Sequence, residues 1–215
     1  MFDKLKNLFK PKSRVPSDEE YSIHYEKKVK AIAGILGPMH NMVIHAIIPF
    51  DVGGAVDMYP FPNALEGTAL VTFELIGPDG TGPLPNDFGT YELLAFTRHK
   101  IDEDETSPFN LTERRLCGIF TRIGNYCTGA VLKPNDTIEI PGGENEPNKC
   151  LVLHEWDAQN TRFSIDGKPH GLLLLLEVFR SEMDFARANG TPELVNLLKK
   201  EGHYPFSDLD RRPVR

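Results

Sequence analysis

The chain has 215 residues, of which 24 are Lys or Arg and 31 are Asp or Glu, so its formal net charge is −7. This length suits one domain, and the acidic balance argues against nucleic acid as a partner because phosphate binding needs clustered basic side chains. The 18 glycines and 17 prolines indicate many turns and short elements, which excludes a simple helix bundle. Three scattered cysteines are too few for a disulfide framework. Neither a signal peptide nor an apolar run long enough to span a bilayer is visible, so we expect a cytoplasmic protein.

The first segment, residues 1–16, differs in charge from the rest, and we predict a basic amphipathic leader followed by one domain over residues 17–215. Five basic residues and one acid lie within residues 1–14, and the apolar residues there recur at helical spacing: Phe2, Leu5, Leu8 and Phe9. A helix of this kind can bind an anionic membrane surface through residues 1–14. Two turns bury little apolar area, so a leader that docks on the domain or stays disordered is favoured.

A capped amphipathic helix is predicted next. Ser17 followed by Glu20 forms a capping box. Apolar side chains then recur at three- and four-residue spacing: Tyr21, Tyr25, Val29, Ile32 and Leu36. Gly37-Pro38 ends the helix.

Strand patterns follow the helix. Residues 42–49 and 55–61 flank a turn signal and are expected to form a hairpin, and residues 68–76 form a third strand. Residues 77–89 are rich in Gly and Pro and are expected to be a surface loop. By periodicity alone residues 91–97 suit a strand or a helix. Pairing with the preceding hairpin favours a strand.

The second half of the chain combines one helix, four β segments and two closing helices. Ser107-Pro108 begins the first of these helices. The four β segments are residues 137–140, 150–156, 162–165 and 171–179. The last of them holds five consecutive leucines without alternation, which predicts a strand covered on both faces.

The closing helices are expected to begin at Ser181 (capped together with Asp184) and at Thr191-Pro192, before a polar tail over residues 203–215. Strands interrupted by helices without regular alternation indicate an α+β fold. We therefore predict a single domain with a mixed, largely antiparallel sheet on which helices pack.

The usual catalytic signatures are missing from the sequence: it contains no G-x-S-x-G, P-loop, G-x-G-x-x-G or H-E-x-x-H motif. Cys150 and His154 share one strand face, and Cys127 is a conceivable third zinc ligand. Zinc ligands usually come in close pairs, which are absent here. A buried cysteine beside a hydrogen-bonded histidine is therefore the favoured interpretation, and we expect no metal and no cofactor.

Two carboxylates, Asp57 and Glu92, lie inside otherwise apolar strands. Each is an outward-facing residue, a partner of an arginine such as Arg98 or Arg122, or a polar point in a binding cleft, because a charge buried without a partner is costly. Paired carboxylates can also perform acid–base chemistry. The alternative function is therefore a metal-assisted hydrolase or other small-molecule enzyme that uses Asp57/Glu92 or the cysteine–histidine pair named above.

Longer segments of the sequence carry a family resemblance. They are VDMYPF at 56–61, ALVTFEL at 69–75, FGTYELL at 88–94, and the closing segments 182–198 and 208–214. In their order and spacing the chain resembles a bacterial, single-domain member of the suppressor of fused family. The resemblance spans about residues 20 to 215.

This resemblance implies a mixed α/β domain that binds proteins and catalyses no reaction. The animal member of the family is a cytoplasmic negative regulator that holds a peptide of its transcription-factor partner by strand addition. Many bacterial relatives are thought to be immunity proteins against toxins. The tyrosine that contacts the peptide in the animal protein corresponds to Leu70 here, so that particular contact is not carried over.

We therefore predict a non-catalytic protein-binding module, an immunity or regulatory protein that sequesters a protein partner. A basic toxin suits the charge of −7 because opposite charges steer association. The candidate partner-binding residues are Asp57, Tyr59, Leu70, Thr72 and Glu92.

Overall fold

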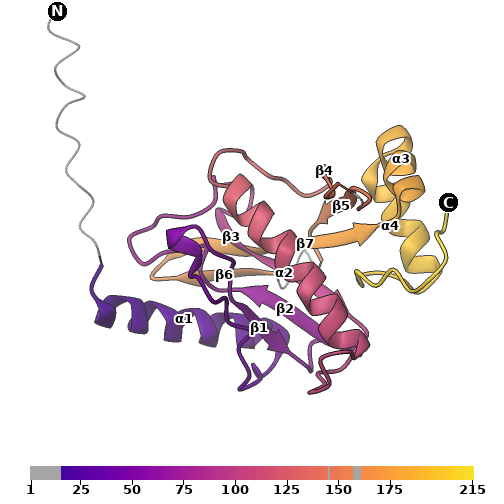
Figure 1. Cartoon of the computed structure of the whole chain (residues 1–215). Coiled ribbons are helices and arrows are strands. Elements are labelled where there is room, and N and C mark those ends of the chain that lie inside the picture. Colours follow the sequence, from indigo (N-terminus) through magenta and orange to yellow (C-terminus); the bar gives the residue numbers. More distant parts are fainter. Residues whose placement is uncertain (1–15, 145, 157–160) are drawn as a thin grey trace, which may run out of the picture.

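A seven-stranded sheet forms the middle layer of the protein, which we describe from a computed structural model over residues 16–144, 146–156 and 161–215 (Figure 1). The strand order is β1-β2-β3-β7-β5-β4, and β6 also pairs with β7. Within the described residues β3 and β7 are parallel, and the other strand pairs are antiparallel. The strands are β1 (Met58–Phe61), β2 (Thr68–Thr72), β3 (Thr90–Thr97), β4 (Thr137–Ile140), β5 (Lys149–His154), β6 (Arg162–Ile165) and β7 (Lys168–Val178). The predicted single-domain α+β fold is confirmed.

Helices cover both faces of this sheet. They are α1 (Asp18–Leu36), α2 (Pro108–Tyr126), α3 (Arg180–Asn189) and α4 (Thr191–Lys200), with a short 3₁₀ helix, η2 (Phe50–Val52). In Figure 1, α2 crosses one face of the sheet, whereas α3 and α4 lie together at the end where β5 begins and β7 ends. None of the helices in the described ranges is both long and apolar enough to pass through a bilayer. The predicted leader, apart from its last residue, lies outside the described residues.

Side-chain alternation along β7 explains why five leucines follow one another. Leu173 and Leu175 pack in the cluster that contains the apolar face of α2. Leu172 and Leu174 point to the opposite face and pack in the cluster that contains α1. Leu176 continues that second face toward α3 and α4. Successive residues of a strand point to opposite faces, so a strand buried on both sides must be apolar throughout, as predicted.

The helix starts follow local capping chemistry. Ser17 Oγ accepts a hydrogen bond from the Glu20 amide at 3.3 Å, and the Glu20 carboxylate accepts one from the Ser17 amide at 2.8 Å, which confirms the predicted capping box. The predicted cap of α3 is wrong, because the helix already begins at Arg180. Its first turn is held instead by the Glu182 side chain, which accepts a hydrogen bond from the Phe179 amide at 3.0 Å.

The predicted strand over residues 42–49 does not form, although Ile44 makes a single bridge to Met58 in β1. Instead of pairing with a neighbouring strand, this segment donates hydrogen bonds to the carboxylate of Asp57. The Ala46 amide donates at 2.8 Å and His45 Nδ1 at 2.7 Å. This pairing turns the backbone away from β1, so residues 47–54 form a loop that contains η2.

The strand predicted over residues 68–76 is shorter than expected, and the segment 91–97 is a strand. β2 ends at Thr72 rather than at residue 76, because the amides of Leu75 and Ile76 donate to the Glu92 carboxylate instead of to a neighbouring strand. Residues 91–97 lie in β3, which pairs with β2 and β7. Residues 77–89 are an irregular loop, as predicted.

The C-terminal segment 203–215 is held firmly against the domain. Ser207 bridges the sheet: its amide donates to the carbonyl of Phe96 in β3, and its hydroxyl donates to the carbonyl of Leu175 in β7. Arg211 forms two hydrogen bonds with the buried carboxylate of Glu182, at 2.6 and 2.9 Å. A segment that reads as a polar tail is therefore a strap that joins β3, β7 and α3.

Candidate functional site

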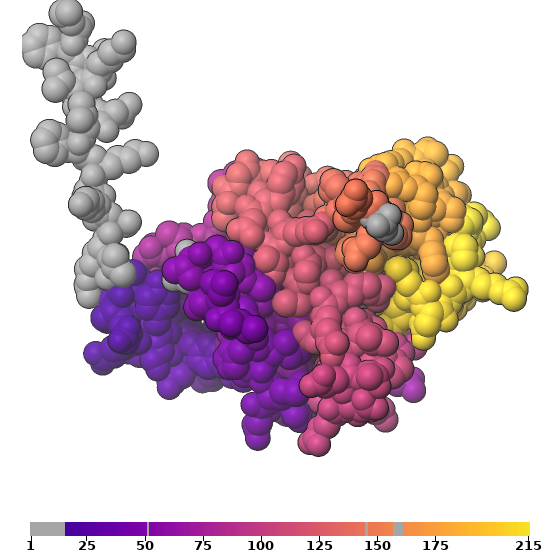
Figure 2. All heavy atoms as spheres, viewed as in Figure 1, coloured from indigo at the N-terminus to yellow at the C-terminus, as the bar shows by residue number. Residues whose placement is uncertain are grey.

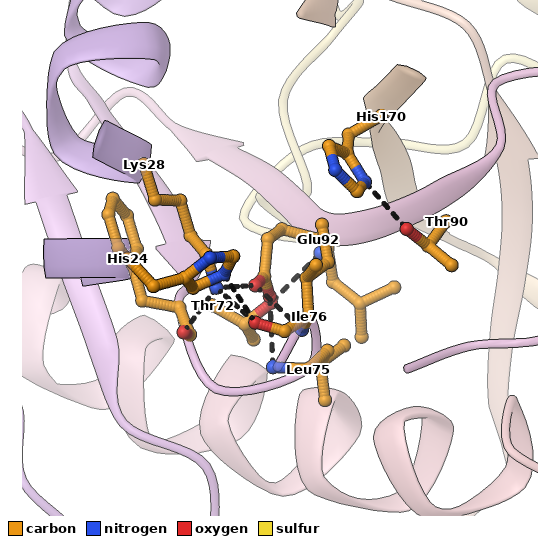
Figure 3. Close-up of polar contacts among 10 residues, drawn as sticks. His24, Lys28, Thr72, Leu75, Ile76, Thr90, Glu92 and His170 are labelled. Carbon is orange, nitrogen blue, oxygen red and sulfur yellow. Dashed lines mark hydrogen bonds and ion pairs between the residues drawn. The ribbon is translucent and has the colours of Figure 1, made fainter. Parts of the chain in front are cut away.

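A buried ion pair lies between α1 and the sheet, at the point where β2 ends. Lys28 Nζ is 2.7 Å from Glu92 Oε1, and the side chains are only 1% and 0% exposed. The ammonium also donates to the carbonyls of Phe73 and Ile76 at 2.7 and 2.8 Å, so all three of its protons have acceptors. Figure 3 shows Lys28 reaching from α1 to Glu92 on β3.

The carboxylate of Glu92 is equally well satisfied. Besides Lys28 and the two amides of Leu75 and Ile76, it accepts a hydrogen bond from Thr72 Oγ1 at 2.7 Å. The Thr72 hydroxyl in turn accepts from the Leu93 amide at 2.9 Å. This network fixes α1, β3 and the chain that follows β2 as one unit. A carboxylate with four hydrogen bonds and no exposed surface is a structural anchor.

An open pocket of about 500 Å³ lies directly above this anchor. Its lining includes His24, Lys28, five aromatic side chains and one carboxylate: Tyr21, Tyr25, Phe50, Tyr59, Phe73 and Glu74. We call it the aromatic pocket. Tyr25, Tyr59 and Phe73 form its inner wall, where the ring centroids of Tyr59 and Phe73 are 4.5 Å apart and Tyr25 lies 5.8 Å from each.

A second pocket of about 500 Å³ lies on the other side of His24, and its lining carries charge of both signs: Glu20, Lys27, Asp79 and Asp166. We call it the acidic pocket. Lys27 Nζ binds Asp166 at 2.6 Å, and this pairing lowers the pKa of the Asp166 carboxyl. Hydrogen bonds from Thr81 lower the pKa of Asp79, so this carboxylate also stays charged.

His24 separates the two pockets and lines both. Its Nε2 lies 3.0 Å from the Ile76 carbonyl oxygen, which can only accept, so Nε2 carries the proton of this hydrogen bond. Burial, and then the nearby charge of Lys28, lower the pKa of His24 below its ordinary value. The histidine is therefore neutral at physiological pH.

Of the five residues predicted to bind a partner, two lie at or beside the aromatic pocket, although Tyr59 is only 8% exposed. Tyr59 lines the aromatic pocket, and Asp57 is placed beside it because its amide donates to Glu74 Oε2 at 2.8 Å. The other three have no exposed surface: Leu70 belongs to the core beneath α2, and Thr72 and Glu92 belong to the network under the pocket. These three support the surface and are not exposed on it.

The partner of Glu92 was not predicted correctly, since Lys28 pairs with it rather than Arg98 or Arg122. A signal for Lys28 was present in the sequence. Lys28 lies three residues after Tyr25 and four before Ile32, so it falls on the apolar face of the helix. A lysine at such a position needs a buried acceptor, and Glu92 is a carboxylate inside an apolar strand.

Cys150 and His154 have separate environments. Cys150 packs in the apolar cluster of α3 and α4, where burial raises the pKa of its thiol. His154 Nδ1 lies 2.8 Å from the Tyr204 hydroxyl. Across the described residues, no three His, Cys, Asp or Glu side chains come together in a group suited to a metal ion.

Comparison with known proteins places the chain in a family. The family model described as suppressor of fused protein matches residues 90–212, more than half of the chain. No curated protein sequence matches the chain. The model match begins at β3, so it includes Glu92 but not the α1 side of the two pockets.

Two solved structures share the fold. A structure titled as the Sufu–Fu complex is 15% identical, with a TM-score of 0.59 over 91% of this chain and 92% of that one. The Drosophila Suppressor of Fused structure is also 15% identical, with a TM-score of 0.56 over 82% of this chain, which corresponds to 47% of that longer protein. At this identity the structures demonstrate a common fold only. Together with the family model, they bear out the resemblance seen in the sequence: the chain belongs to the suppressor of fused family.

Proposed function

We propose that the chain is a non-catalytic protein-binding module that sequesters a protein partner at the surface formed by the aromatic pocket, the acidic pocket and the loop 47–52. The observation that carries this proposal is a group of exposed apolar side chains on the loop from which Phe50 reaches the aromatic pocket. Ile48 and Val52 are 58% and 70% exposed, on either side of Phe50, which lines the aromatic pocket. Clustered exposed apolar side chains mark protein interaction sites.

The helix α1 extends this apolar surface. Tyr21 and Ile23 on its first turns are about half exposed, and each lines one of the two pockets. In Figure 2 the purple segment that contains the loop lies directly against the indigo helix. A partner that covers both would bury apolar rings and aliphatic side chains in one continuous contact.

The charge of this surface favours a basic partner. Lys28 is neutralised by Glu92 and Lys27 by Asp166. The linings of the two pockets hold further carboxylates, so acids outnumber bases there: Glu20, Glu74 and Asp79. The whole chain also carries a net charge of −7. Electrostatic complementarity of this kind raises association rates and selects partners. A basic toxin, held by an immunity protein, fits this requirement, as does the basic segment of a regulated protein.

Further support for binding comes from the comparison. The related structure titled as the Sufu–Fu complex holds that family member together with another protein. The three cysteines of this chain, all described, are free thiols, which suits the reducing cytoplasm where we place the protein. We assign the binding role to residues 17–215.

An enzymatic function finds less support at the predicted residues. Glu92 is buried and uses both oxygens in hydrogen bonds, so it has no access to a substrate proton. Asp57 is committed to the Ala46 amide and to His45. General acid–base catalysis requires a group within hydrogen-bond reach of the substrate, which Glu92 lacks.

The test is capture of the partner from the source cell, followed by reconstitution of the complex from purified proteins. Ile48→Asp is expected to weaken the complex by roughly tenfold or more, because it places a charge in an apolar contact. Leu111→Asp is the matched control, since Leu111 is equally exposed but lies on α2. If the partner is a toxin, co-expression of the wild-type chain restores growth and co-expression of the Ile48 variant does not. Equal effects of the two substitutions contradict the proposed surface.

A further inference from the structure

We propose that the open edge of the sheet at β4 binds a second copy of this chain, so that two copies pair β4 with β4 in an antiparallel, two-fold arrangement. β4 is the last strand in the sheet order, and within the described residues β5 is its one strand partner. An unpaired strand edge presents backbone amides and carbonyls that can pair with another strand. The inference goes beyond the proposed function, because the aromatic pocket lies at the opposite end of the sheet, where Tyr59 belongs to β1.

A groove of about 980 Å³ runs along this edge, and we call it the β4 groove. One wall is the whole of β4 with the residues next to it, and the other wall is the last turns of α2 with the segment that follows. Tyr126 and Val131 on the second wall are 56% and 46% exposed, and Ile138 on the first wall is partly buried. The groove therefore combines apolar side chains with an open strand edge, which an added strand can cover.

The side-chain alternation of β4 limits how two copies can pair. Ile138 and Ile140 pack in the cluster that contains α2, whereas Glu139 points to the other face and binds Arg180 and Arg187 of α3. Directly opposed residues of antiparallel strands point to the same face. The two registers that overlap most of the strand therefore place Ile138 opposite Ile138 or Glu139 opposite Glu139. The second register is unfavourable because it sets like charges side by side.

In the Ile138 register the two ends of the β4 groove are complementary in charge. Asp136 lies at one end, and Arg122 lies at the other, where its Nη1 donates to the Pro141 carbonyl at 2.7 Å. This register places Asp136 of each copy opposite Ile140 of the other copy, and so next to Arg122. An interface between identical chains requires such reciprocity, because each contact occurs twice. The reciprocal charges identify a second copy as the occupant, rather than a strand of another protein.

Glu139 does not prevent this pairing, although a charged residue in a short edge strand often does. It is neutralised by Arg180 and Arg187, and it accepts a further hydrogen bond from Asn148 at 2.6 Å. In the Ile138 register it lies opposite Thr137 of the second copy, which carries no charge. The carboxylate therefore holds β4 against α3 without repelling a second strand.

Sedimentation equilibrium of the full chain, from about 1 µM to about 1 mM, measures the dimer directly. We expect a monomer–dimer equilibrium without larger species, because the two-fold contact uses the β4 edge of both copies. Val131→Asp is expected to weaken the dimer by roughly tenfold or more, because it places a charge in an apolar contact. Val131 is exposed in the single chain, so this variant keeps the fold.

Charge reversal tests the register. Arg122→Glu and Asp136→Lys are each expected to weaken the dimer by roughly tenfold, because each brings like charges together. The double variant is expected to return to within severalfold of the wild-type affinity, since the reciprocal attraction is restored. Asp136 also accepts a hydrogen bond from the Lys133 amide at 2.8 Å, so circular dichroism verifies the fold of its variant. Arg114→Glu is the control, because Arg114 is an exposed arginine of α2 outside the groove.

A chain that stays monomeric at every concentration overturns the inference, and so does a dimer that the folded Val131→Asp and Arg122→Glu variants leave intact. A strand of the partner protein is the competing occupant. If the chain is monomeric and Val131→Asp weakens the partner complex, the groove binds the partner and the inference is wrong. Loss of the dimer in Val131→Asp with unchanged partner affinity supports it. Weakening of the partner complex by Ile48→Asp tests the proposed function separately, because that substitution leaves the dimer unchanged.

Discussion

The Lys28 ammonium can be buried because it donates hydrogen bonds to three acceptors inside the protein: two backbone carbonyls and the Glu92 carboxylate. Desolvating an ion is costly, and the pair is tolerated only because both partners are saturated with hydrogen bonds. The consequence is asymmetric: removing one partner leaves an uncompensated buried charge, whereas removing both charges leaves a polar but neutral network.

This asymmetry gives a stability prediction. Lys28→Met is expected to lower the free energy of unfolding by about 3–5 kcal/mol, and Glu92→Gln by a similar amount, since each leaves a buried ion alone. The double variant is expected to lose much less than the sum, because the side-chain oxygen of the introduced glutamine can still accept from the amides of Leu75 and Ile76. Urea unfolding measures the free energy of unfolding of the two single variants and of the double variant.

A matched control is the exposed pair of Lys27 and Asp166, whose side chains are about half exposed or more. Lys27→Met is expected to cost less than about 1 kcal/mol. Additive losses in the double variant would show that the Lys28–Glu92 pair is not energetically coupled.

A second prediction at the scale of single residues concerns pH. Burial lowers the pKa of His24, and it does the same for His154 and His170. The unfolded chain therefore binds protons more readily at these sites, and the free energy of unfolding falls as the pH drops below the ordinary histidine value of 6.5. In His24→Gln this fall is expected to be smaller.

Urea unfolding between about pH 7.5 and pH 5 tests this sign. His40→Gln replaces an exposed histidine outside both pockets and serves as the control for the substitution itself. A steeper slope in His24→Gln would show that the protonated histidine is stabilised in the folded protein.

For single residues, the sequence predicts an interaction when its two partners are close together in the chain, and not when they are far apart. Ser17 and Glu20 are three residues apart, so their capping box is visible in the sequence. Glu92 is recognisable as an anomaly inside an apolar strand, but its partner Lys28 is 64 residues away. No residue near Glu92 in the sequence indicates which cation forms the ion pair with it.

At the scale of elements, the C-terminal strap is the main departure from expectation. The polar side chains of this strap form contacts within the domain. Arg211 forms hydrogen bonds with Glu182 at the start of α3, and Asp208 accepts a hydrogen bond from the Arg98 amide at 2.8 Å. Glu182 thus serves both the helix cap and the strap. Amino-acid composition alone cannot distinguish a polar segment exposed to solvent from one whose polar side chains are bonded to the domain.

Arg211→Met is expected to destabilise the domain by about 3 kcal/mol or more, because it leaves the Glu182 carboxylate buried without its cation. Amide hydrogen exchange should rise first in α3 and in the strap, where the lost contacts lie. The exposed Arg212 provides the control, and Arg212→Met should leave exchange unchanged. Uniform loss of protection across the whole sheet would contradict a local role.

At the scale of the whole molecule, the acidic charge should be visible in binding kinetics. With a net charge of −7 and acidic pocket linings, association with a basic partner is steered electrostatically. Raising the salt concentration from about 0.05 to 0.5 M is expected to lower the association rate constant by roughly tenfold, with a much smaller change in the dissociation rate. Stopped-flow mixing measures both, and a salt-independent association rate would contradict steering.

The central position of β7 also determines when the protein can fold during synthesis. All three hydrophobic clusters include side chains of β7, which spans Lys168–Val178. Its parallel pairing with β3 joins segments that are about 80 residues apart, and such distant pairings form slowly. We expect that no part of the core closes on the ribosome until β7 has emerged. Until then the apolar faces of α1, α2 and the first three strands remain open, so the nascent chain depends on chaperones or on rapid completion of translation.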